Sequence, residues 1–394
     1  MRHIYVHVPF CARRCSYCDF SIAVRKTVPA DRYVAAVTRE LESRKEGGEW
    51  DDEPLETLYF GGGTPSLLPP KHLAELVGAL VNRPTAQPPN RLTAQPPTRL
   101  TVQPPNRPTE ITLEANPDDV TPEAAAAWVG AGVNRVSLGS QSFHPAVLAW
   151  MHRTHDADAV PRAVQVLRDA GIQSLSLDFI FGLPEELNAS FERDLERAVA
   201  LGPDHLSIYG LSVEARTPLA RWISRGATGA PSDERYADEF LLAHDRLSAA
   251  GYRHYEVSNY ALPGRESRHN SAYWDERDYA GLGPAAHSMT RGVRRWNFAQ
   301  WTAYERAAKG GSDPTEARER LSGRQRQLER LYLGLRTDRG VAKAPWWTID
   351  PSKEQAWTSE GWLVREGDRY RFTARGWLRL DELVSSLTTS AESG

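Results

Sequence analysis

The sequence predicts an α/β protein in which a partial TIM-like barrel of six strand–helix units is followed by a smaller α+β region. Apolar stretches of strand length alternate with segments of helical periodicity through the first half of the chain, and polar clusters follow the ends of these stretches. This rhythm loosens after about residue 220. We therefore expect a barrel over residues 1–220 and a C-terminal domain over residues 221–394.

The predicted strands are rich in Ile, Val, Leu, Tyr and Phe. They cover residues 3–8, 56–60, 110–114, 135–139, 174–179 and 205–211. Between two of them, Leu73, Leu76 and Leu80 recur at helical spacing and mark the buried face of a helix. Thr121 followed by Pro122 predicts the start of another helix, with threonine as the N-cap and proline in the first turn. Repeated strand–helix units of this kind predict a parallel sheet.

Residues 82–109 interrupt the pattern with an eight-residue repeat. Gln-Pro-Pro occurs at residues 87–89, 95–97 and 103–105. Proline fixes φ and removes backbone donors, so we expect an extended surface insertion. The alternative is a proline-motif ligand or a basic tether.

The C-terminal region has fewer and shorter elements. We expect a helix over residues 233–250, an aromatic strand over 252–260, a helix over 325–335, strands over 361–364 and 370–373, and a closing helix over 374–387. A helix followed by a short hairpin resembles a winged-helix module. We interpret this module as structural packing rather than DNA binding, because the chain as a whole is nearly neutral.

Charge and hydropathy limit the partners. The chain has 48 basic and 51 acidic residues, a net charge of -3, which gives no whole-chain attraction for nucleic acid. No apolar run reaches the length of a membrane span, and residues 1–8 alternate like a strand instead of forming a secretory signal. We expect a cytoplasmic protein without nucleic-acid partners or a transmembrane segment, for which transient docking to a membrane stays open.

All the cysteines of the chain, Cys11, Cys15 and Cys18, lie within eight consecutive residues. This clustering predicts a shared metal rather than a disulfide framework, because thiolates are soft ligands for zinc, copper(I) or iron–sulfur clusters. A zinc site would need a fourth ligand such as Asp19 or His7. Three thiolates on a [4Fe-4S] cluster would leave one iron open to another ligand.

The spacing Cys-x-x-x-Cys-x-x-Cys resembles the signature of the radical S-adenosylmethionine (SAM) enzymes. The resemblance implies a [4Fe-4S] cluster whose open iron is chelated by SAM, which is cleaved on reduction to a 5′-deoxyadenosyl radical. Residues 61–64, Gly-Gly-Gly-Thr, follow the second strand and resemble the glycine motif of that family, whose backbone meets the SAM amino group. A glycine run at a strand end also lets backbone approach a ligand closely.

The resemblance extends over nearly the whole chain to the subgroup that contains oxygen-independent coproporphyrinogen III dehydrogenase and the HemW family of heme chaperones. Its further motifs are Tyr-Cys-Asp-Phe at residues 17–20, Glu-Ala-Asn-Pro at 114–117, Gln-Ser-Phe at 141–143, Gly-Leu-Pro at 182–184 and Gly-Leu-Gly-Pro at 281–284. Carried over by position, the resemblance implies these SAM contacts: Tyr5, Tyr17, Gly62, Gly63, Thr64, Glu114, Gln141, Arg153 and Asp178.

Two positions separate the members of this subgroup. The dehydrogenases resemble Cys-x-x-x-Cys-x-x-Cys-x-Cys, but this chain has Phe20 in place of the last cysteine. Residues 269–274, His-Asn-Ser-Ala-Tyr-Trp, resemble the His-Asn-x-x-Tyr-Trp motif of the heme chaperones. A neutral imidazole can ligate heme iron, which makes His269 the preferred heme ligand and His287 a weaker competitor.

The resemblance thus implies a heme chaperone with a [4Fe-4S] cluster, SAM and heme as its cofactors, and hemoproteins, respiratory ones among them, as acceptors. The alternative is an oxygen-independent coproporphyrinogen III dehydrogenase, a radical SAM oxidative decarboxylase. A third alternative, a homologue without cofactors, disagrees with the presence of all three thiols and the glycine motif. No catalytic residue is assigned.

Overall fold

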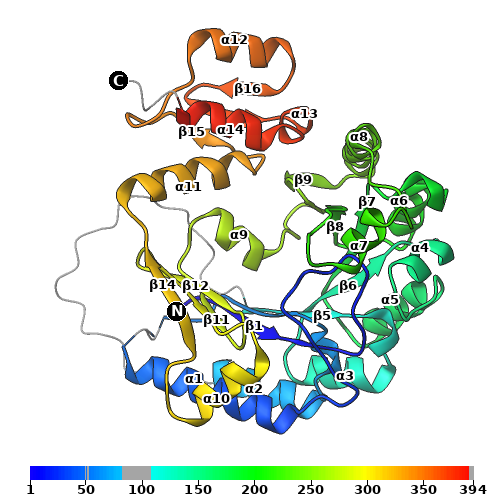
Figure 1. The fold of residues 1–394 in the computed structure, drawn as a ribbon, viewed down its shortest axis with the longest axis vertical. Coiled ribbons are helices and arrows are strands. Elements are labelled where there is room, and N and C mark those ends of the chain that lie inside the picture. Colours follow the sequence, from blue (N-terminus) through cyan, green and yellow to red (C-terminus); the bar gives the residue numbers. More distant parts are fainter. Residues whose placement is uncertain (49, 51–52, 82–107, 390–394) are drawn as a thin grey trace.

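The structure, a computed structural model, describes residues 1–48, 50, 53–81 and 108–389. Within these residues, one sheet holds nine strands in the order β11-β1-β4-β5-β6-β7-β8-β10-β9 (Figure 1). Its centre is parallel and is built from β1 (His3–Val8), β4 (Thr57–Gly62), β5 (Glu110–Ala115), β6 (Arg135–Gln141), β7 (Ser174–Phe181) and β8 (His205–Gly210). The six predicted strands are therefore confirmed, several of them longer at their carboxyl ends. The predicted insertion lies outside the described residues, except for residues 108 and 109.

Helices cover the outer face of this sheet. They are α1 (Ala30–Glu46), α2 (Pro70–Val81), α3 (Pro122–Gly130), α5 (Ala159–Asp169), α6 (Phe191–Ala200) and α8 (Asp233–Ala249). Two short helices, α4 (Pro145–Trp150) and α7 (Pro218–Ser224), instead pack in a separate apolar cluster that includes Tyr17 of the cysteine segment. Short 3-10 turns η1 (Pro65–Leu67), η2 (Pro117–Asp119) and η3 (Glu185–Leu187) follow three of the strands. The Thr121 side chain accepts a hydrogen bond from the Ala124 amide, which confirms the predicted cap of α3.

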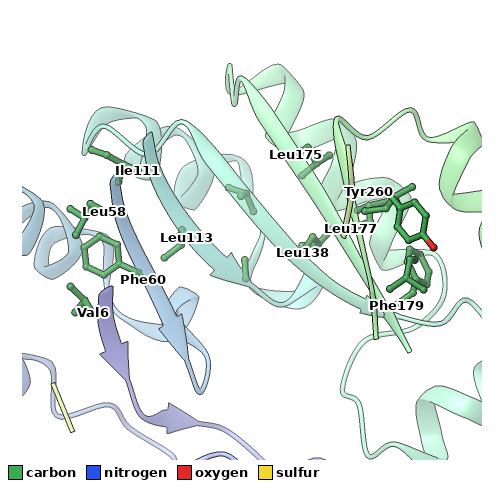
Figure 2. Packing of buried hydrophobic residues seen from close by; sticks show 14 of the residues in the cluster. Val6, Leu58, Phe60, Ile111, Leu113, Leu138, Leu175, Leu177, Phe179 and Tyr260 are labelled. Atoms are coloured by element: carbon green, nitrogen blue, oxygen red, sulfur yellow. The ribbon is translucent and has the colours of Figure 1, made fainter. Parts of the chain in front are cut away.

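The core lies between the sheet and these helices. Figure 2 shows Val6, Leu58, Leu113, Leu138 and Leu177, one from each of five neighbouring strands, side by side in it. All five are essentially inaccessible to solvent. Because successive strand side chains alternate between faces, this outer packing turns the intervening residues toward the interior of the barrel. Several polar residues of the site, such as Glu114 and Asp178, come from this inner set, and the others come from the loops after the strands.

Three strands beyond residue 220 extend the same sheet. The expected single strand over residues 252–260 is instead a hairpin of β9 (Arg253–Glu256) and β10 (Asn259–Ala261), and β10 pairs antiparallel with β8. At the other edge β11 (Ala280–Leu282) pairs parallel with β1. The segments predicted as two domains therefore share one sheet.

A second layer packs on the β11 edge. It holds an antiparallel sheet of β12 (His287–Thr290), β13 (Val293–Asn297) and β14 (Thr315–Arg320), together with α10 (Trp301–Lys309), which packs on α1. The short helix α9 (Arg268–Trp274) lies between β10 and β11 in the chain and contacts β4. A small parallel pair, β2 (Phe10–Cys11) and β3 (Ala23–Val24), flanks the cysteine segment.

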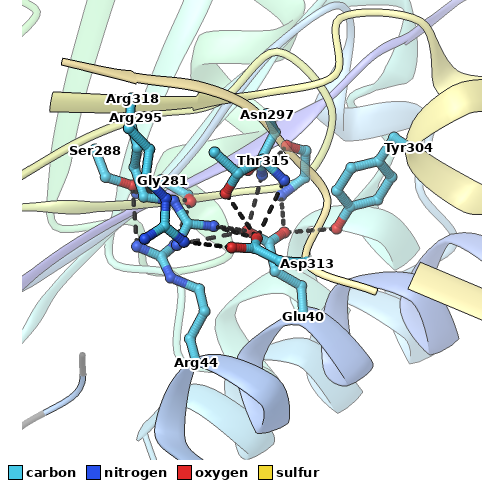
Figure 3. Close-up of polar contacts among 11 residues, drawn as sticks. Glu40, Arg44, Gly281, Ser288, Arg295, Asn297, Tyr304, Asp313, Thr315 and Arg318 are labelled. Atoms are coloured by element: carbon cyan, nitrogen blue, oxygen red, sulfur yellow. Dashed lines mark hydrogen bonds and ion pairs between the residues drawn. The ribbon is translucent and has the colours of Figure 1, made fainter. Parts of the chain in front are cut away.

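A buried polar network joins this layer to the barrel (Figure 3). The carboxylate of Glu40 on α1, 1% exposed, accepts hydrogen bonds from Gly283 N (2.9 Å), Asn297 Nδ2 (2.8 Å) and Tyr304 Oη (2.7 Å). Arg44 lies 3.6 Å from the same carboxylate and donates to the Gly281 carbonyl at 2.7 Å. One carboxylate thus ties α1 to the residue after β11, to β13 and to α10.

The chain ends in a small module at one end of the molecule (Figure 1). It contains α11 (Gly323–Leu335), α12 (Pro351–Ser359), α13 (Ala374–Trp377), α14 (Leu380–Thr389) and an antiparallel sheet of β15 (Val341–Ala342), β17 (Arg369–Phe372) and β16 (Leu363–Glu366). The expected winged-helix-like order of helix and hairpin is present, but the single closing helix is two helices. Across the described ranges, no helix combines the length and the apolar character that crossing a bilayer requires.

Candidate functional site

A cavity of about 460 Å³ opens at the carboxyl ends of the parallel strands, where the loops after β1 and β4 meet those after β5 to β8. Barrels of this kind place ligand sites at this end. We call it the cysteine cavity, because all three cysteines line it. Eight of the nine predicted SAM contacts also line it: Tyr17, Gly62, Gly63, Thr64, Glu114, Gln141, Arg153 and Asp178.

The cysteine loop follows β1 directly. Cys11 ends the short strand β2, and its Sγ accepts a 3.5 Å hydrogen bond from Thr64 Oγ1. Burial raises the pKa of the Cys11 thiol, and burial raises that of Cys18 to about 11. All three thiols are free of disulfide bonds. A metal that binds thiolates must therefore displace protons from buried groups.

A single-ion site needs three or more ligands that converge on one point. Among the described residues, no group of three His, Cys, Asp or Glu side chains is placed in this way. His7, a proposed fourth zinc ligand, has both ring nitrogens engaged, at 3.1 Å from Tyr5 Oη and 3.1 Å from the Ser21 carbonyl. An iron–sulfur cluster distributes its thiolates over separate irons, so it does not require them to converge on one point.

The glycine motif forms the rim between β4 and the cysteine loop. Gly62 has φ +115°, a conformation that side chains rarely adopt. A Cβ on Gly63 would lie 2.8 Å from the backbone of Pro9 and Phe10. Glycine is therefore required for the two loops to touch. The Gly63 amide donates to the Val8 carbonyl at 2.8 Å, and both glycines line the cavity.

Glu114, at the end of β5, is the acid nearest this rim. Its carboxylate accepts hydrogen bonds from Tyr59 Oη (2.8 Å) and Gly62 N (3.1 Å). Burial raises the pKa of Glu114 to about 7, against the lowering effect of the Tyr59 hydrogen bond and with a further rise from the nearby Asp178. Hence the cavity holds an acid that titrates near neutral pH and that a bound cation would deprotonate.

We expect Glu114 to make the cofactor-free protein less stable as pH rises. The folded-state pKa of about 7 lies above the ordinary 4.5, so this contribution is present below about pH 4.5 and is lost as pH rises through 7. Between pH 4.5 and 8, the unfolding free energy of wild type should fall by about 1–3 kcal/mol relative to that of Glu114→Gln. Denaturant titrations at several pH values would measure this. The exposed Glu75→Gln on α2 is the control, and a difference that does not vary with pH contradicts the prediction.

Asp178 and Gln141 face the same cavity from neighbouring strands. Asp178 accepts hydrogen bonds from Ser137 Oγ at 2.9 Å and Ser176 Oγ at 3.2 Å, and burial raises its pKa. Gln141 has φ +65°, and the register between β6 and β7 shifts between Gly139 and Gln141. A positive φ is uncommon for a residue with a side chain. Together with the bulge, it places Gln141 in the cavity wall.

Arg153 brings a positive charge to the cysteine loop. Its Nη1 lies 3.7 Å from Cys15 Sγ, and its Nη2 donates to Asn116 Oδ1 at 2.6 Å and to the Gly139 carbonyl at 2.8 Å. Its Nε is buried without a hydrogen-bond partner. Asn116 belongs to the Glu-Ala-Asn-Pro motif, although no contact was predicted for Asn116 itself.

Two predicted site residues lie elsewhere. Tyr5 does not line the cysteine cavity; its hydroxyl meets His7 and its ring stacks on Tyr59, with centroids 6.0 Å apart. His269 is 1% exposed, with Nδ1 2.7 Å from Thr57 Oγ1 and Nε2 2.9 Å from Tyr273 Oη. Burial lowers the pKa of His269 to about 3. In this structure both of its ring nitrogens are hydrogen-bonded, and His269 lines neither the cysteine cavity nor the larger one described below.

Several residues that line the cysteine cavity were not predicted from the sequence. They are tyrosines, serines and one arginine on the inner strand faces: Tyr59, Arg135, Ser137, Ser207 and Tyr209. Strand alternation was the available signal, since Ser207 and Tyr209 lie two apart on β8 and share its inner face.

The comparisons with known proteins agree with this geometry. The radical SAM superfamily pattern matches residues 5–198. A Mycobacterium tuberculosis protein named heme chaperone HemW is 36% identical over 387 residues, which cover 98% of this chain and 94% of that one. The Escherichia coli protein of the same name is 32% identical and is covered to 96%. A Bos taurus protein, radical S-adenosyl methionine domain-containing protein 1, mitochondrial, is 31% identical and is covered to 86%.

Among solved structures, the coproporphyrinogen III oxidase HemN from Escherichia coli superimposes with a TM-score of 0.77 over 98% of this chain and 90% of that one. At 21% identity this likeness shows the fold. Identity above 30% along almost the full length of several HemW proteins goes further, and it shows that the chain belongs to the HemW family within the radical SAM superfamily.

Proposed function

We propose that this protein is a heme chaperone that binds heme and passes it to acceptor hemoproteins, and that its barrel holds a [4Fe-4S] cluster and SAM. The observation that carries the proposal is the match of nearly the whole chain to proteins named heme chaperone HemW. Those relatives span the C-terminal region as well as the barrel, so the match includes the part of the chain beyond the cluster loop.

The cysteine cavity fits a cluster with SAM. Cys11, Cys15 and Cys18 would hold the cluster, which supplies an electron for the reductive cleavage of SAM. Arg153, whose buried Nε has no partner, suits a carboxylate, and Gly62 and Gly63 line the cavity where their backbone can meet the remaining polar groups of an amino acid. Glu114 and Asp178 suit an ammonium or ribose hydroxyls, and Tyr17, Thr64 and Gln141 complete the wall. Tyr5 would contribute only through its contact with Tyr59.

We test the chaperone function by heme transfer. Full-length protein, reconstituted anaerobically with iron and sulfide, is titrated with hemin and then mixed with an apo-hemoprotein whose heme-bound absorbance is distinct. Stoichiometric binding followed by transfer to the acceptor is the expected result. Failure to bind heme, or binding without any transfer, overturns the proposal.

The same sample tests the alternative function, oxidative decarboxylation. Where the dehydrogenase pattern has a further cysteine, this chain has Phe20, which is 63% exposed. We expect no conversion of coproporphyrinogen III under anaerobic reducing conditions with SAM present. Conversion without specific heme binding makes the protein a dehydrogenase. We further propose that it acts in the cytoplasm and that respiratory hemoproteins are among its acceptors.

A further inference from the structure

A second and larger cavity, of about 890 Å³, lies between the β12–β13 layer, α9 and α11. We call it the C-terminal cavity. The cysteine cavity and the C-terminal cavity share Phe20 in their walls. Apart from Tyr5, none of the predicted SAM contacts lines the C-terminal cavity, and no cysteine lines it. A cluster and SAM in the cysteine cavity would therefore not occupy the C-terminal cavity.

We propose that the C-terminal cavity is the heme site and that the imidazole of His287 is the iron ligand. The inference rests on the proposed function and identifies where the heme of that function binds. It differs from the sequence-based preference for His269.

His287 is the accessible imidazole of this chain. All eleven histidines lie in the described residues, and His287 alone among them is exposed. Neither of its ring nitrogens makes a hydrogen bond to a described residue, and its ring stacks on Trp296 with centroids 5.8 Å apart. An imidazole held by ring stacking with free nitrogens is ready to ligate iron. His7, the other histidine in this wall, has both nitrogens engaged.

The wall around His287 suits a flat apolar ligand. Met289 lies two residues further along β12, so it shares the face of His287 and approaches the cavity from the same side. For that reason it cannot be the opposite axial ligand, but it can pack on the macrocycle. Trp274 and Tyr279 add aromatic surface. Tyr273 also lines this cavity, and its hydroxyl is held by His269. The chaperone motif thus reaches the cavity through its aromatic residues, with His269 as a positioning residue.

The charge of the wall matches two propionates. Five arginines and three carboxylates line the C-terminal cavity. Arg294 and Arg330 are paired with Glu329 and Glu276. The guanidinium groups that make no ion pair with any described residue are those of Arg277, Arg291 and Arg326. Such free guanidinium groups can bind carboxylates in bidentate fashion.

The test uses full-length reconstituted protein, with hemin binding followed by difference absorbance and magnetic circular dichroism. We expect His287→Ala to weaken hemin binding at least tenfold, to remove the imidazole-ligated spectrum, and to regain that spectrum with free imidazole. His244→Ala, a half-buried histidine on α8 that lines neither cavity, should bind as wild type does.

A second pair of variants tests the cavity without the iron ligand. Arg291→Gln and Arg326→Gln together should weaken hemin several-fold and leave the affinity for heme dimethyl ester, which lacks the propionate charges, unchanged. Two results would show that the site assignment is wrong while the chaperone function stands, provided that wild type binds and transfers heme. One is a His287→Ala protein with the wild-type affinity and spectrum. The other is an arginine double variant that weakens hemin and heme dimethyl ester equally. If wild type does not bind hemin at all, the proposed function itself fails.

Discussion

Replacing Cys15 with alanine should abolish the iron–sulfur cluster. A three-thiolate site has no spare protein ligand, and the chain has no other cysteine that could substitute. Partial or full burial raises the pKa of the Cys18 and Cys11 thiols, so the cost of removing their protons is offset only when a metal binds. We expect iron and sulfide content after reconstitution to fall on the order of tenfold or more, with loss of the visible cluster absorbance.

Asp19→Asn is the matched control for this variant. Asp19 is exposed in the same loop and lines the cysteine cavity, and it is the acid that a zinc site would recruit. We expect its iron and sulfide content to equal that of wild type. If wild type binds stoichiometric zinc and Asp19→Asn loses it, the site is a zinc site and not a cluster site. If Cys15→Ala keeps its full iron content, the assignment of Cys15 as a cluster ligand is wrong.

Glu40→Ala should cause the largest loss of stability. The variant removes the carboxylate that lies 3.6 Å from Arg44, which is 4% exposed, and it removes the acceptor of Gly283 N, Asn297 and Tyr304. Arg295 keeps its ion pair with Asp313 at 3.0 Å. Removing one partner of a buried ion pair costs about 3–5 kcal/mol, because the remaining charge is not solvated. Denaturant unfolding of the cofactor-free protein would measure the loss.

Two further variants identify its cause. Glu42→Ala, an exposed position on the same helix, should change the unfolding free energy by about 0.5 kcal/mol or less. Glu40→Gln keeps the side-chain shape and an acceptor oxygen but removes the negative charge. Its loss of unfolding free energy should therefore lie between those of Glu42→Ala and Glu40→Ala. A Glu40→Ala protein as stable as wild type would show that the network in Figure 3 does not hold the β12–β13 layer on the barrel.

The strands and the cysteine loop could be predicted because their signals are local. Ile4, Val6 and Val8 alternate within six residues, and the three thiols lie within eight, so neither needed a distant contact to be recognised. The hairpin of β9 and β10 was predicted as one strand because the turn between them contains ordinary residues, Val257 and Ser258, without a glycine or proline signal. The break between α13 and α14 has no such signal either.

The directions of Tyr5 and His269 depended on which neighbours occupy their polar atoms. Tyr5 has the position of a SAM contact in the motif, but stacking on Tyr59 and the hydroxyl contact with His7 direct it away from the cysteine cavity. His269 lies in a motif that suggested a heme ligand, yet Thr57, 212 residues away in sequence, occupies one ring nitrogen and Tyr273 the other. A sequence pattern reports which residue types are present, and it does not report which of their atoms are already hydrogen-bonded.

By itself, then, the sequence determined the parallel strand–helix architecture, the three thiols in one loop and the family resemblance, since these depend on periodicity and spacing along the chain. Only the tertiary structure decided that Glu40 joins α1 to the residue after β11, to β13 and to α10, and that His287 and not His269 presents an exposed imidazole. The physical reason is that burial and hydrogen-bond occupancy at these positions include contacts between residues more than 200 positions apart, such as Thr57 with His269 and Glu40 with Gly283, which no local pattern encodes.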